Sequence, residues 1–333
     1  MSRRSRLIVI FAAAGLALLP VLAEAHGNVA SPPPTLWRLL TRWEFDPLFI
    51  LVVVLSSWIY FAAVQRVNRL HAKAPWPRKR TIYFMSGNLV LVIALISPPA
   101  SYDTDLFSLH MVQHLLITMV AAPLFLLGTP VTLALRAATP QIRRNVLLPI
   151  LHSRALRIVM FPVVSWLVFA AVMWLSHFSA LYEASLTNTW IHRGEHLLYL
   201  LAALMFWWQA IGLDPTPWRM PHPVRMLYVF LQLPQSSFLG VAIYQAPEVL
   251  YSHYANLGRT WGPSPLFDQQ TAGTIMWLLG DMMFLAALGF IGHGWMKHEE
   301  LETKRVDHQL ARERAQNKAA REAAAATTTD SSG

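Results

Sequence analysis

Apolar runs of about 20 residues recur along most of this chain, and they constrain its fold more than any other feature. The hydrocarbon core of a bilayer is about 30 Å thick, so a helix needs roughly 20 apolar residues to cross it. Hydrophobic residues make up 55 % of the chain and charged residues only 14 %, whereas about 25 % charged residues is usual in soluble domains. We therefore predict an all-α polytopic membrane protein.

Seven segments have the length and composition of membrane-spanning helices. They predict one seven-helix membrane domain over 46–295, although the length of the chain alone would also fit two soluble domains. The predicted spans are 46–64, 81–97, 106–127, 156–175, 190–211, 224–245 and 270–291.

The first 25 residues have the three parts of a secretory signal peptide. Three arginines precede an apolar run from Leu7 to Leu22, and the small-x-small motif Ala23-Glu24-Ala25 follows. We predict cleavage before His26 and a periplasmic segment over 26–45. An uncleaved first helix with its N-terminus inside is the alternative, and it leaves residue 26 on the same outer face.

The charges of the loops predict the orientation of the spans. Short cytoplasmic loops are rich in Lys and Arg, and the loops after the first, third and fifth spans are the basic ones in this chain. We therefore predict an inner-membrane protein with its mature N-terminus outside and its C-terminus in the cytoplasm. The cytoplasmic tail over 296–333 alternates basic and acidic residues before an Ala/Thr/Ser-rich end, which predicts a solvated helix that is partly disordered.

Composition excludes several classes of site. The chain has no cysteine, so disulfides, thiolate metal sites and iron–sulfur clusters are excluded. The formal net charge is +9, but the basic residues lie in short loops, where they orient the helices in the lipid bilayer. We therefore expect no nucleic-acid partner.

Two histidine pairs with the same spacing are the strongest functional signal. His110 and His114 form one pair, and His192 and His196 form the other. Residues four apart share a helix face, and both pairs lie near the start of a span that enters from outside. His177 lies at the outer end of the fourth span. Imidazole is a good ligand for copper, zinc or haem iron, although packing at the membrane interface would also account for any single histidine.

Two further residues are candidates with structural alternatives. The thioether of Met111 suits Cu(I), but methionine also fills gaps in cores. Asp281 lies near the middle of the last span, where a carboxylate is costly. It can relay protons, belong to a metal pathway or pair with a buried donor.

The segment from His192 to His196 also matches the inverted zinc-protease pattern, in which Glu195 would activate a water molecule. A hydrolase would need a third ligand, for which Glu183 or Glu248 is the candidate. An intramembrane zinc hydrolase is therefore one alternative function.

Several motifs, taken together and in order, give the chain a specific resemblance. The chain resembles the CtaG family of cytochrome c oxidase assembly factors, named for the caa3-type oxidase. The resemblance covers roughly 40–295 and implies a seven-helix plasma-membrane protein, not itself an oxidase subunit, that is needed for maturation of the terminal oxidase and its copper. The motifs are His110 to His114 with Pro123 and Gly128-Thr129-Pro130, Trp174 to Phe178 with Leu181-Tyr182-Glu183, His192 to His196 with Phe206-Trp207-Trp208, and Pro265-Leu266 with Asp268-Gln269-Gln270, Gly273 and Met276-Trp277.

The resulting hypothesis is a non-enzymatic assembly factor that takes copper on the two histidine pairs and delivers it to cytochrome c oxidase subunits. His177 and Met111 are auxiliary ligands in this hypothesis. The alternatives are a b-type haem electron carrier, with one axial histidine from each pair, a copper importer, with a path past Asp281, and the zinc hydrolase. A scaffold that uses its histidines structurally would have the same spans.

Overall fold

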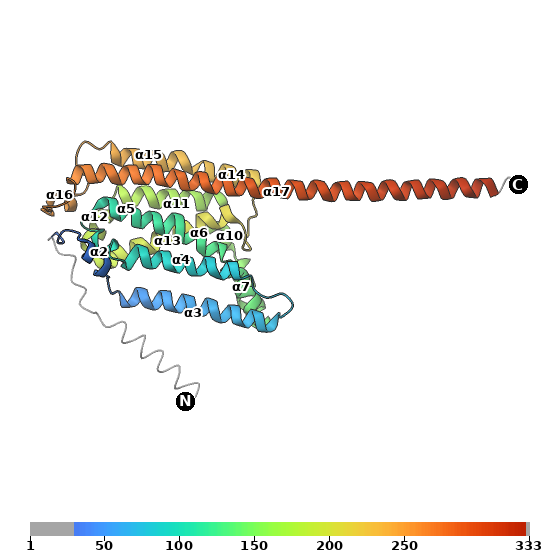
Figure 1. The fold of residues 1–333 in the computed structure, drawn as a ribbon, viewed down its shortest axis with the longest axis horizontal. Coiled ribbons are helices and arrows are strands. Elements are labelled where there is room, and N and C mark those ends of the chain that lie inside the picture. Colours follow the sequence, from blue (N-terminus) through green and yellow to red (C-terminus); the bar gives the residue numbers. More distant parts are fainter. Residues whose placement is uncertain (1–29, 331–333) are drawn as a thin grey trace, which may run out of the picture.

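The protein is a bundle of long helices. The computed structural model describes residues 30–330; helices account for 78 % of the structure, and no strand occurs in the described part. The predicted all-α fold is confirmed. The predicted signal peptide over 1–25 lies outside the described residues. Most helices run side by side along the long axis, and α17 extends far beyond the others (Figure 1).

The helices follow one another along the chain as single rods or as rods with short breaks. They are α2 (Leu36–Thr41), α3 (Pro47–Leu70), α4 (Arg78–Ile96), η1 (Ala100–Tyr102), α5 (Phe107–Leu115), the π-helical η2 (Leu116–Ala121), α6 (Ala122–Leu127), α7 (Pro130–Ala137), α8 (Pro140–Ile142), the π-helical η3 (Arg143–Leu147), α9 (Leu148–Leu151), α10 (Arg154–Val159), α11 (Pro162–His177), α12 (Ala180–Thr187), α13 (Thr189–Ile211), α14 (His222–Phe230), α15 (Gln232–Tyr244), α16 (Ser252–Asn256) and α17 (Pro265–Asp330).

Five helical segments in the described chain are long and apolar enough to cross a membrane. A sixth is reached if α11 and α12, which are bent by 67° at the break after His177, form one broken span. The five segments are Pro47–Leu70, Arg78–Tyr102, Phe107–Ala137, His222–Tyr244 and Pro265–Asn317.

The predicted count of seven spans is not confirmed, because α11 counts only together with α12 and α13 does not count. Helix α13 has 23 residues and covers the predicted span 190–211, but it is not among the five segments. Its first two turns carry His192, Arg193, Glu195 and His196, which lower its mean hydropathy. The polar residues that suggest a function are thus the ones that weaken its resemblance to an ordinary span.

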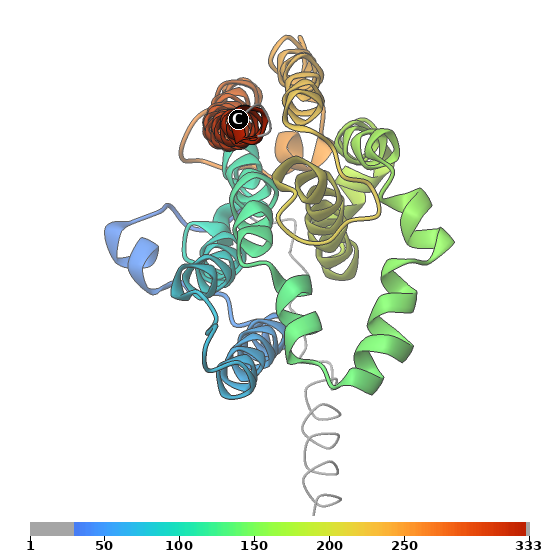
Figure 2. The same cartoon turned by 90° about the vertical axis from the view of Figure 1, so that its right-hand side faces the viewer.

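The two ends of the bundle differ in what they contain. One end, which we call the α16 end, carries α2, α12 and α16, and the other, the α7 end, carries α7 and α10 (Figure 1). Viewed from the α7 end, the segment from α7 to α10 lies around the side of the bundle (Figure 2). α17 continues past the α7 end as one helix into the charged tail, where Lys304 and Glu300 form an ion pair of 2.6 Å.

Small residues allow α15 and α17 to pack closely. A Cβ atom added to Gly273 would lie 2.7 Å from the carbonyl oxygen of Gly240, and one added to Gly240 would lie 2.8 Å from the Cβ of Trp277. Contacts this short are not tolerated, so both positions require glycine. The small-residue start of the last helix is therefore a packing feature that fixes α17 against α15.

Candidate metal centre

The helix that carries the first histidine pair is fixed at its start by a side chain from α17. The Asp268 carboxylate accepts hydrogen bonds from the backbone N–H of Phe107 at 2.7 Å and from the hydroxyl of Ser108 at 2.5 Å. The first N–H groups of a helix have no partner within the helix, so Asp268 caps α5 from another part of the chain. This contact places His110 in the first turn of α5, near the α16 end.

The second pair is fixed by a cap within its own segment. The side chain of Asn188 accepts hydrogen bonds from the backbone N–H groups of Trp190 at 2.9 Å and Ile191 at 3.2 Å. An Asn at this position is a strong signal for the start of a helix. It places His192 in the first turn of α13 and His196 one turn later.

The structure brings the four histidines of the two pairs together. The rings of His110 and His192 stack at 10° with their centroids 5.4 Å apart, and the rings of His114 and His196 are 5.8 Å apart. Within the pairs, the rings are 4.2 Å apart on α5 and 4.3 Å apart on α13. The two helix faces that the spacing predicts therefore meet in one cluster.

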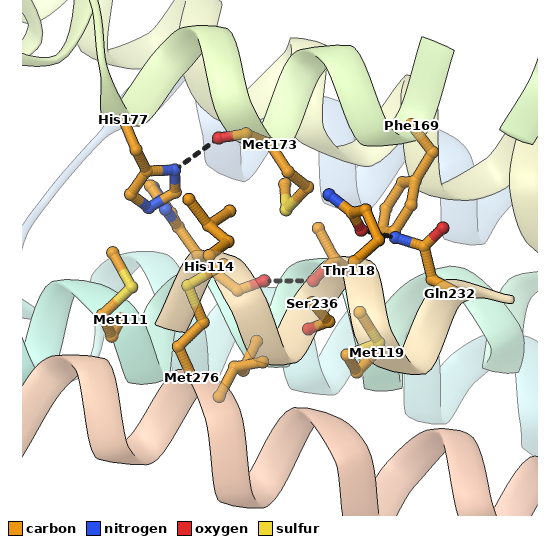
Figure 3. A pocket seen from close by; sticks show the side chains of 13 residues that line it. Met111, His114, Thr118, Met119, Phe169, Met173, His177, Gln232, Ser236 and Met276 are labelled. Carbon is orange, nitrogen blue, oxygen red and sulfur yellow. Dashed lines mark hydrogen bonds between the residues drawn. The ribbon is translucent and has the colours of Figure 1, made fainter. Parts of the chain in front are cut away.

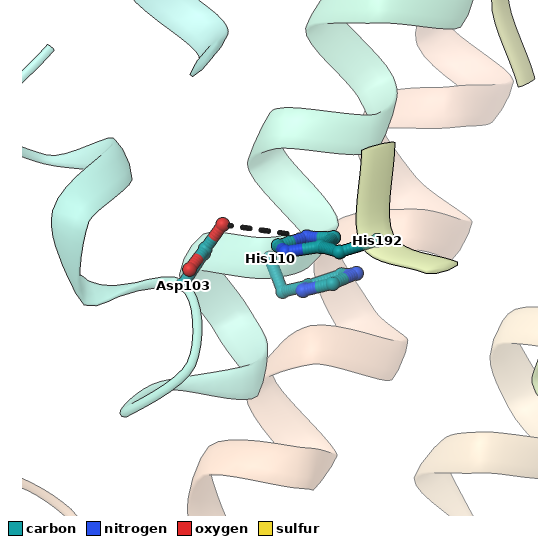
Figure 4. A group of neighbouring side chains, drawn as sticks. All are labelled: Asp103, His110 and His192. Atoms are coloured by element: carbon teal, nitrogen blue, oxygen red, sulfur yellow. Dashed lines mark ion pairs between the residues drawn. The ribbon is translucent and has the colours of Figure 1, made fainter. Parts of the chain in front are cut away.

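Two carboxylates join this cluster. Nε2 of His192 lies 3.7 Å from Oδ2 of Asp103, and Nε2 of His110 lies 4.0 Å from Oε2 of Glu195. Candidate ligand atoms lie within 4.8 Å of one another in two overlapping sets, Asp103/His110/His192 and His110/His114/Glu195. Figure 4 shows Asp103 and His192 facing each other, with His110 beside them. We call His110, His114, His192, His196, Asp103 and Glu195 the histidine–carboxylate centre.

A glutamine orients two members of the centre. The Nε2 amide of Gln113 donates hydrogen bonds to the carbonyl oxygen of Ala94 at 3.0 Å and to Oδ2 of Asp103 at 2.9 Å. Its Oε1 is therefore the acceptor for Nε2 of His196, 2.9 Å away. The proton of His196 then lies on Nε2, and the lone pair lies on Nδ1. Ligand histidines usually have such a partner on the other ring nitrogen.

The centre contains buried polar atoms that nothing in the described chain satisfies. Both ring nitrogens of His110 and both of His114 are buried and have no hydrogen-bond partner among residues 30–330. Buried polar atoms are nearly always paired, and an unpaired one calls for an explanation such as a bound ion. Imidazole and carboxylate ligands suit Cu(II) and Zn²⁺, so the donor set fits a metal ion.

Aromatic side chains enclose the centre at the α16 end. Phe107 lies 5.0 Å from Tyr251 and 5.5 Å from Tyr182, and the ring of Tyr182 lies 4.9 Å from that of His110. All three aromatic residues are buried. They keep water away from the histidines, which makes the unpaired nitrogens more costly.

Charged residues form a rim beside the centre, and one of them, Glu44, precedes the first predicted span. Arg193 forms an ion pair of 2.9 Å with Asp46, the residue that caps α3. Burial, with repulsion from Asp103 and Asp46 opposed by Arg42, raises the pKa of Glu44 to about 7. A proton on Glu44 is therefore coupled to the charge on Asp103.

His177 and Met111 lie next to the centre. His177 is the last residue of α11, and its ring lies 6.3 Å from that of His114. Nδ1 of His177 lies 2.6 Å from the carbonyl oxygen of Met173. Met111 is 1 % exposed, and it lines a small cavity together with His114 and His177 (Figure 3).

Asp281 is placed apart from the centre. It accepts a hydrogen bond from Ser237 on α15, and it belongs to neither of the metal-compatible sets found among the described residues. The structure therefore gives Asp281 the neighbouring donor that the sequence allowed as an alternative. A role in a proton or metal pathway remains a prediction.

Two other sequence candidates have structural partners. Glu183, a third ligand in the zinc-hydrolase hypothesis, accepts hydrogen bonds from Ser252 and from the backbone N–H of His253 at 2.9 Å, and so holds α16. Gln269 accepts from the N–H of Leu250 at 2.7 Å. These residues of the shared motifs support the α16 end rather than supply ligands to the centre.

Sequence analysis missed Asp103 and Gln113 as parts of the site and gave Glu195 a role only in a hydrolase. Asp103 lies in a loop without basic residues, and Gln113 lies directly before His114. A polar residue on a predicted span next to a ligand candidate is a usable signal for Gln113. For Asp103 the signal is weaker, because an acid in an outer loop is common.

The fold and this site define a helical membrane protein with a buried histidine–carboxylate centre near one end of its bundle. The sequence profile of the cytochrome c oxidase caa3 assembly factor family, Caa3_CtaG, matches residues 58–298. The chain belongs to this family, which confirms the family prediction.

Curated mycobacterial relatives are also similar to the chain. The uncharacterized proteins Mb0105 of Mycobacterium bovis and MT0111 of Mycobacterium tuberculosis are each 30 % identical to it over 285 residues, which is 83 % of this chain and 42 % of each relative. ML1998 of Mycobacterium leprae is 28 % identical over 282 residues. The chain thus spans less than half the length of these relatives. No solved structure matches it significantly.

Proposed function

We propose that this protein is an inner-membrane assembly factor that binds copper at the histidine–carboxylate centre and aids metallation of the terminal oxidase. The observation that carries the proposal is the set of four converging imidazoles, two of which have buried ring nitrogens without a partner in the described chain. Two carboxylates lie among them. Membership in the caa3 assembly-factor family supports the process, assembly of the oxidase.

The chemistry of the donor set supports copper as a cargo. Among the divalent first-row metals, Cu(II) binds nitrogen and oxygen sites most tightly. The chain has no cysteine, so the centre is not a closed thiolate cage. Imidazole and carboxylate ligands, supplied by three separate segments, can exchange one at a time, which a delivery site requires. No bond-making chemistry is needed, and the proposed role is non-enzymatic.

The position of the centre supports loading from the periplasmic side. It lies toward the α16 end, whereas α7 with Arg136 and the start of α4 with Arg78 lie toward the opposite end. Basic residues in short loops face the cytoplasm. The α16 end then faces the periplasm, the C-terminal tail lies in the cytoplasm, and the partners are oxidase subunits under assembly.

A complementation experiment in the source cells tests this function. Cells that lack the gene receive the wild type, a variant with His110→Ala and His192→Ala, or a His152→Ala control. His152 is exposed and its ring contacts the carbonyl oxygen of Leu148 in α9. We expect the double variant to leave oxidase activity and oxidase copper at the level of the deletion, with total cellular copper unchanged, while the control restores both.

Two outcomes of this experiment would contradict the proposal. Full restoration of oxidase copper by the double variant, present at wild-type abundance in the membrane, would show that the centre is not needed. A loss of total cellular copper in parallel with oxidase copper would favour the importer. A b-type haem carrier would instead be seen as a Soret band in the purified wild-type protein.

A further inference from the structure

A second group of potential ligands lies beside the histidine–carboxylate centre. Four methionines and two histidines line a cavity of about 20 Å³, a volume that holds about one water-sized particle. The methionines come from four separate elements, α5, η2, α11 and α17. We call this the thioether cavity, and its six ligand candidates are Met111, Met119, Met173, Met276, His114 and His177.

The orientation of His177 is the observation that points to a ligand. The carbonyl oxygen of Met173 accepts a hydrogen bond from Nδ1 at 2.6 Å, so the proton lies on Nδ1 and the lone pair on Nε2. That Nε2 atom is buried and has no hydrogen-bond partner in the part of the chain that the structure describes. Figure 3 shows it directed toward His114 and Met111. A backbone carbonyl on the far ring nitrogen is the usual support of a metal-binding histidine.

The local helix geometry keeps the cavity in place. The π-helical turn η2 begins directly after α5, and the Thr118 hydroxyl within it donates to the carbonyl oxygen of His114 at 2.7 Å. The indole N–H of Trp207 donates to the carbonyl oxygen of Thr118 at 2.9 Å. π-helical turns are frequent at functional sites, and this one connects the His114 backbone to α13.

Packing alone does not account for this set of residues. Methionine is a common filler of irregular cores, and a filler needs no polar neighbour. The wall of the cavity that holds Phe169 and Leu239 is apolar, yet the cavity also contains an unpaired imidazole nitrogen. Thioether sulfur selects soft ions such as Cu(I) over Zn²⁺ and Cu(II).

We propose that the thioether cavity is a second metal site, selective for Cu(I), held by methionine sulfurs and by Nε2 of His177. The proposal rests on the proposed function in taking copper as the cargo. His114 stands between the two sites, because its ring lies 5.8 Å from that of His196 and 6.3 Å from that of His177. It allows a Cu(I) ion, with no change of oxidation state, to pass between them by exchange of one ligand at a time.

The test uses the full-length protein purified in detergent and Ag(I), a soft monovalent probe that does not change oxidation state. A variant with Met111→Leu and Met173→Leu is compared with wild type and with a Met296→Leu control. Leucine has a volume close to that of methionine, and Met296 is 66 % exposed on α17. We expect the double variant to bind Ag(I) at least about tenfold more weakly, and the control to bind as wild type does.

X-ray absorption of the Cu(I)-loaded protein gives a second readout. We expect sulfur scattering in wild type and its reduction in the methionine variant, in which Met119 and Met276 remain. At the same time, Cu(II) binding, which reports on the histidine–carboxylate centre, should be unchanged in that variant. His177→Met should retain Ag(I) binding and His177→Phe should lose it, since a soft ligand replaces the imidazole only in the first.

The two proposals fail in different ways. A Cu(I) spectrum with nitrogen and oxygen neighbours only, or Ag(I) binding that the methionine changes leave intact, overturns the thioether cavity and leaves the centre standing. Cu(II) binding that survives His110→Ala with His192→Ala overturns the centre. A wild-type protein that binds neither Ag(I) nor Cu(II) overturns both.

Discussion

The polar groups at the two ends of the bundle are buried in different ways. At the α7 end, the Tyr60 hydroxyl donates to the carbonyl oxygen of Gly128 at 2.8 Å and accepts from the indole N–H of Trp76 at 3.2 Å. Asp214 accepts from the Thr132 backbone N–H at 2.8 Å and so caps α7. At the α16 end, the ring nitrogens of His110 and His114 have no such partners among the described residues.

This difference separates structural polar residues from those available to a ligand. A buried donor or acceptor without a partner costs about 1–3 kcal/mol. At the α7 end Tyr60 and Asp214 avoid that cost by pairing, and the Oε1 atom of Gln209 in the last turn of α13 is an exception, buried without a partner among the described residues. Arg80 donates to the Thr129 hydroxyl at 2.9 Å, and Thr129 has a positive φ of 49° that this network holds in place. We interpret the α7 end as a fixed support and the α16 end as a site that is completed by an ion.

The largest expected effect comes from removing two ligands at the α16 end. His110→Ala with His192→Ala should reduce Cu(II) affinity by more than about 100-fold, because an ion loses ligands from both helices. The metal-free protein should lose some stability but stay folded, because two buried side chains are truncated and Asp103 loses its contact with His192. Titration calorimetry and a melting curve in the same detergent measure both quantities. If the variant lost much of its stability without metal but kept its Cu(II) affinity, the histidines at the α16 end would be structural and not ligands.

Gln113→Leu should have the next largest effect. The substitution keeps the size of the side chain but removes the hydrogen bonds to Asp103 and His196. Loss of a group that orients ligands typically costs 10–100-fold in metal affinity, and we expect a change within about that range in Cu(II) titrations. Gln113→Glu retains the acceptor for His196 but places a carboxylate against Asp103, so it isolates the effect of losing the donor to Asp103. Equal affinity in wild type and Gln113→Leu would show that the network does not orient the ligands.

At the α7 end, Asp214→Ala should affect stability and not metal binding. The substitution leaves the first N–H groups of α7 without their acceptor, and the loss of a helix cap costs about 0.5–2 kcal/mol. Chemical unfolding in mixed micelles measures this cost, and a Cu(II) titration on the same sample provides the comparison. Weaker copper binding in a folded Asp214→Ala protein would mean that the two ends are coupled.

The smallest expected effect is a pH dependence at the rim of the centre. Glu44 has a pKa of about 7 in the fold against 4.5 for the free side chain. The folded state therefore binds more protons in this interval, and the contribution of Glu44 to stability is fully present below pH 4.5 and is lost as pH rises through 7. Glu44→Gln should make the melting temperature depend less on pH between pH 5.5 and 8. If the melting temperature of the variant changed with pH as much as that of wild type, Glu44 would not be the group that causes the pH dependence.

The sequence predicted the parts of this account that depend on local patterns. The four-residue spacing of His110/His114 and His192/His196 placed each pair on one helix face, and alternating loop charges predicted an orientation that stays a prediction. The helical fold and the family were predicted and are confirmed. These features follow from helix periodicity and from hydrophobic length, which a single sequence contains.

The remaining features depend on contacts between distant segments. Asp268 caps a helix 161 residues away, at Phe107, and Asp103 reaches His192 from a separate loop. The π-helical turn after α5 was not predicted, and the bend after His177 lies where the Ser179 side chain caps α12. Hydropathy does not identify α13 as a membrane span, because residues that belong to the centre make that helix more polar.

The most direct test of the central claim is metal analysis of the purified protein combined with electron paramagnetic resonance after Cu(II) loading. Copper, zinc and iron are measured in wild type and in the variant with His110→Ala and His192→Ala, with folding checked in both. We predict bound Cu(II) in wild type with hyperfine structure from imidazole nitrogens, and the loss of this Cu(II) signal in the variant. Copper that stays bound with the same spectrum in the variant, or a wild type that takes up no copper, would contradict the account.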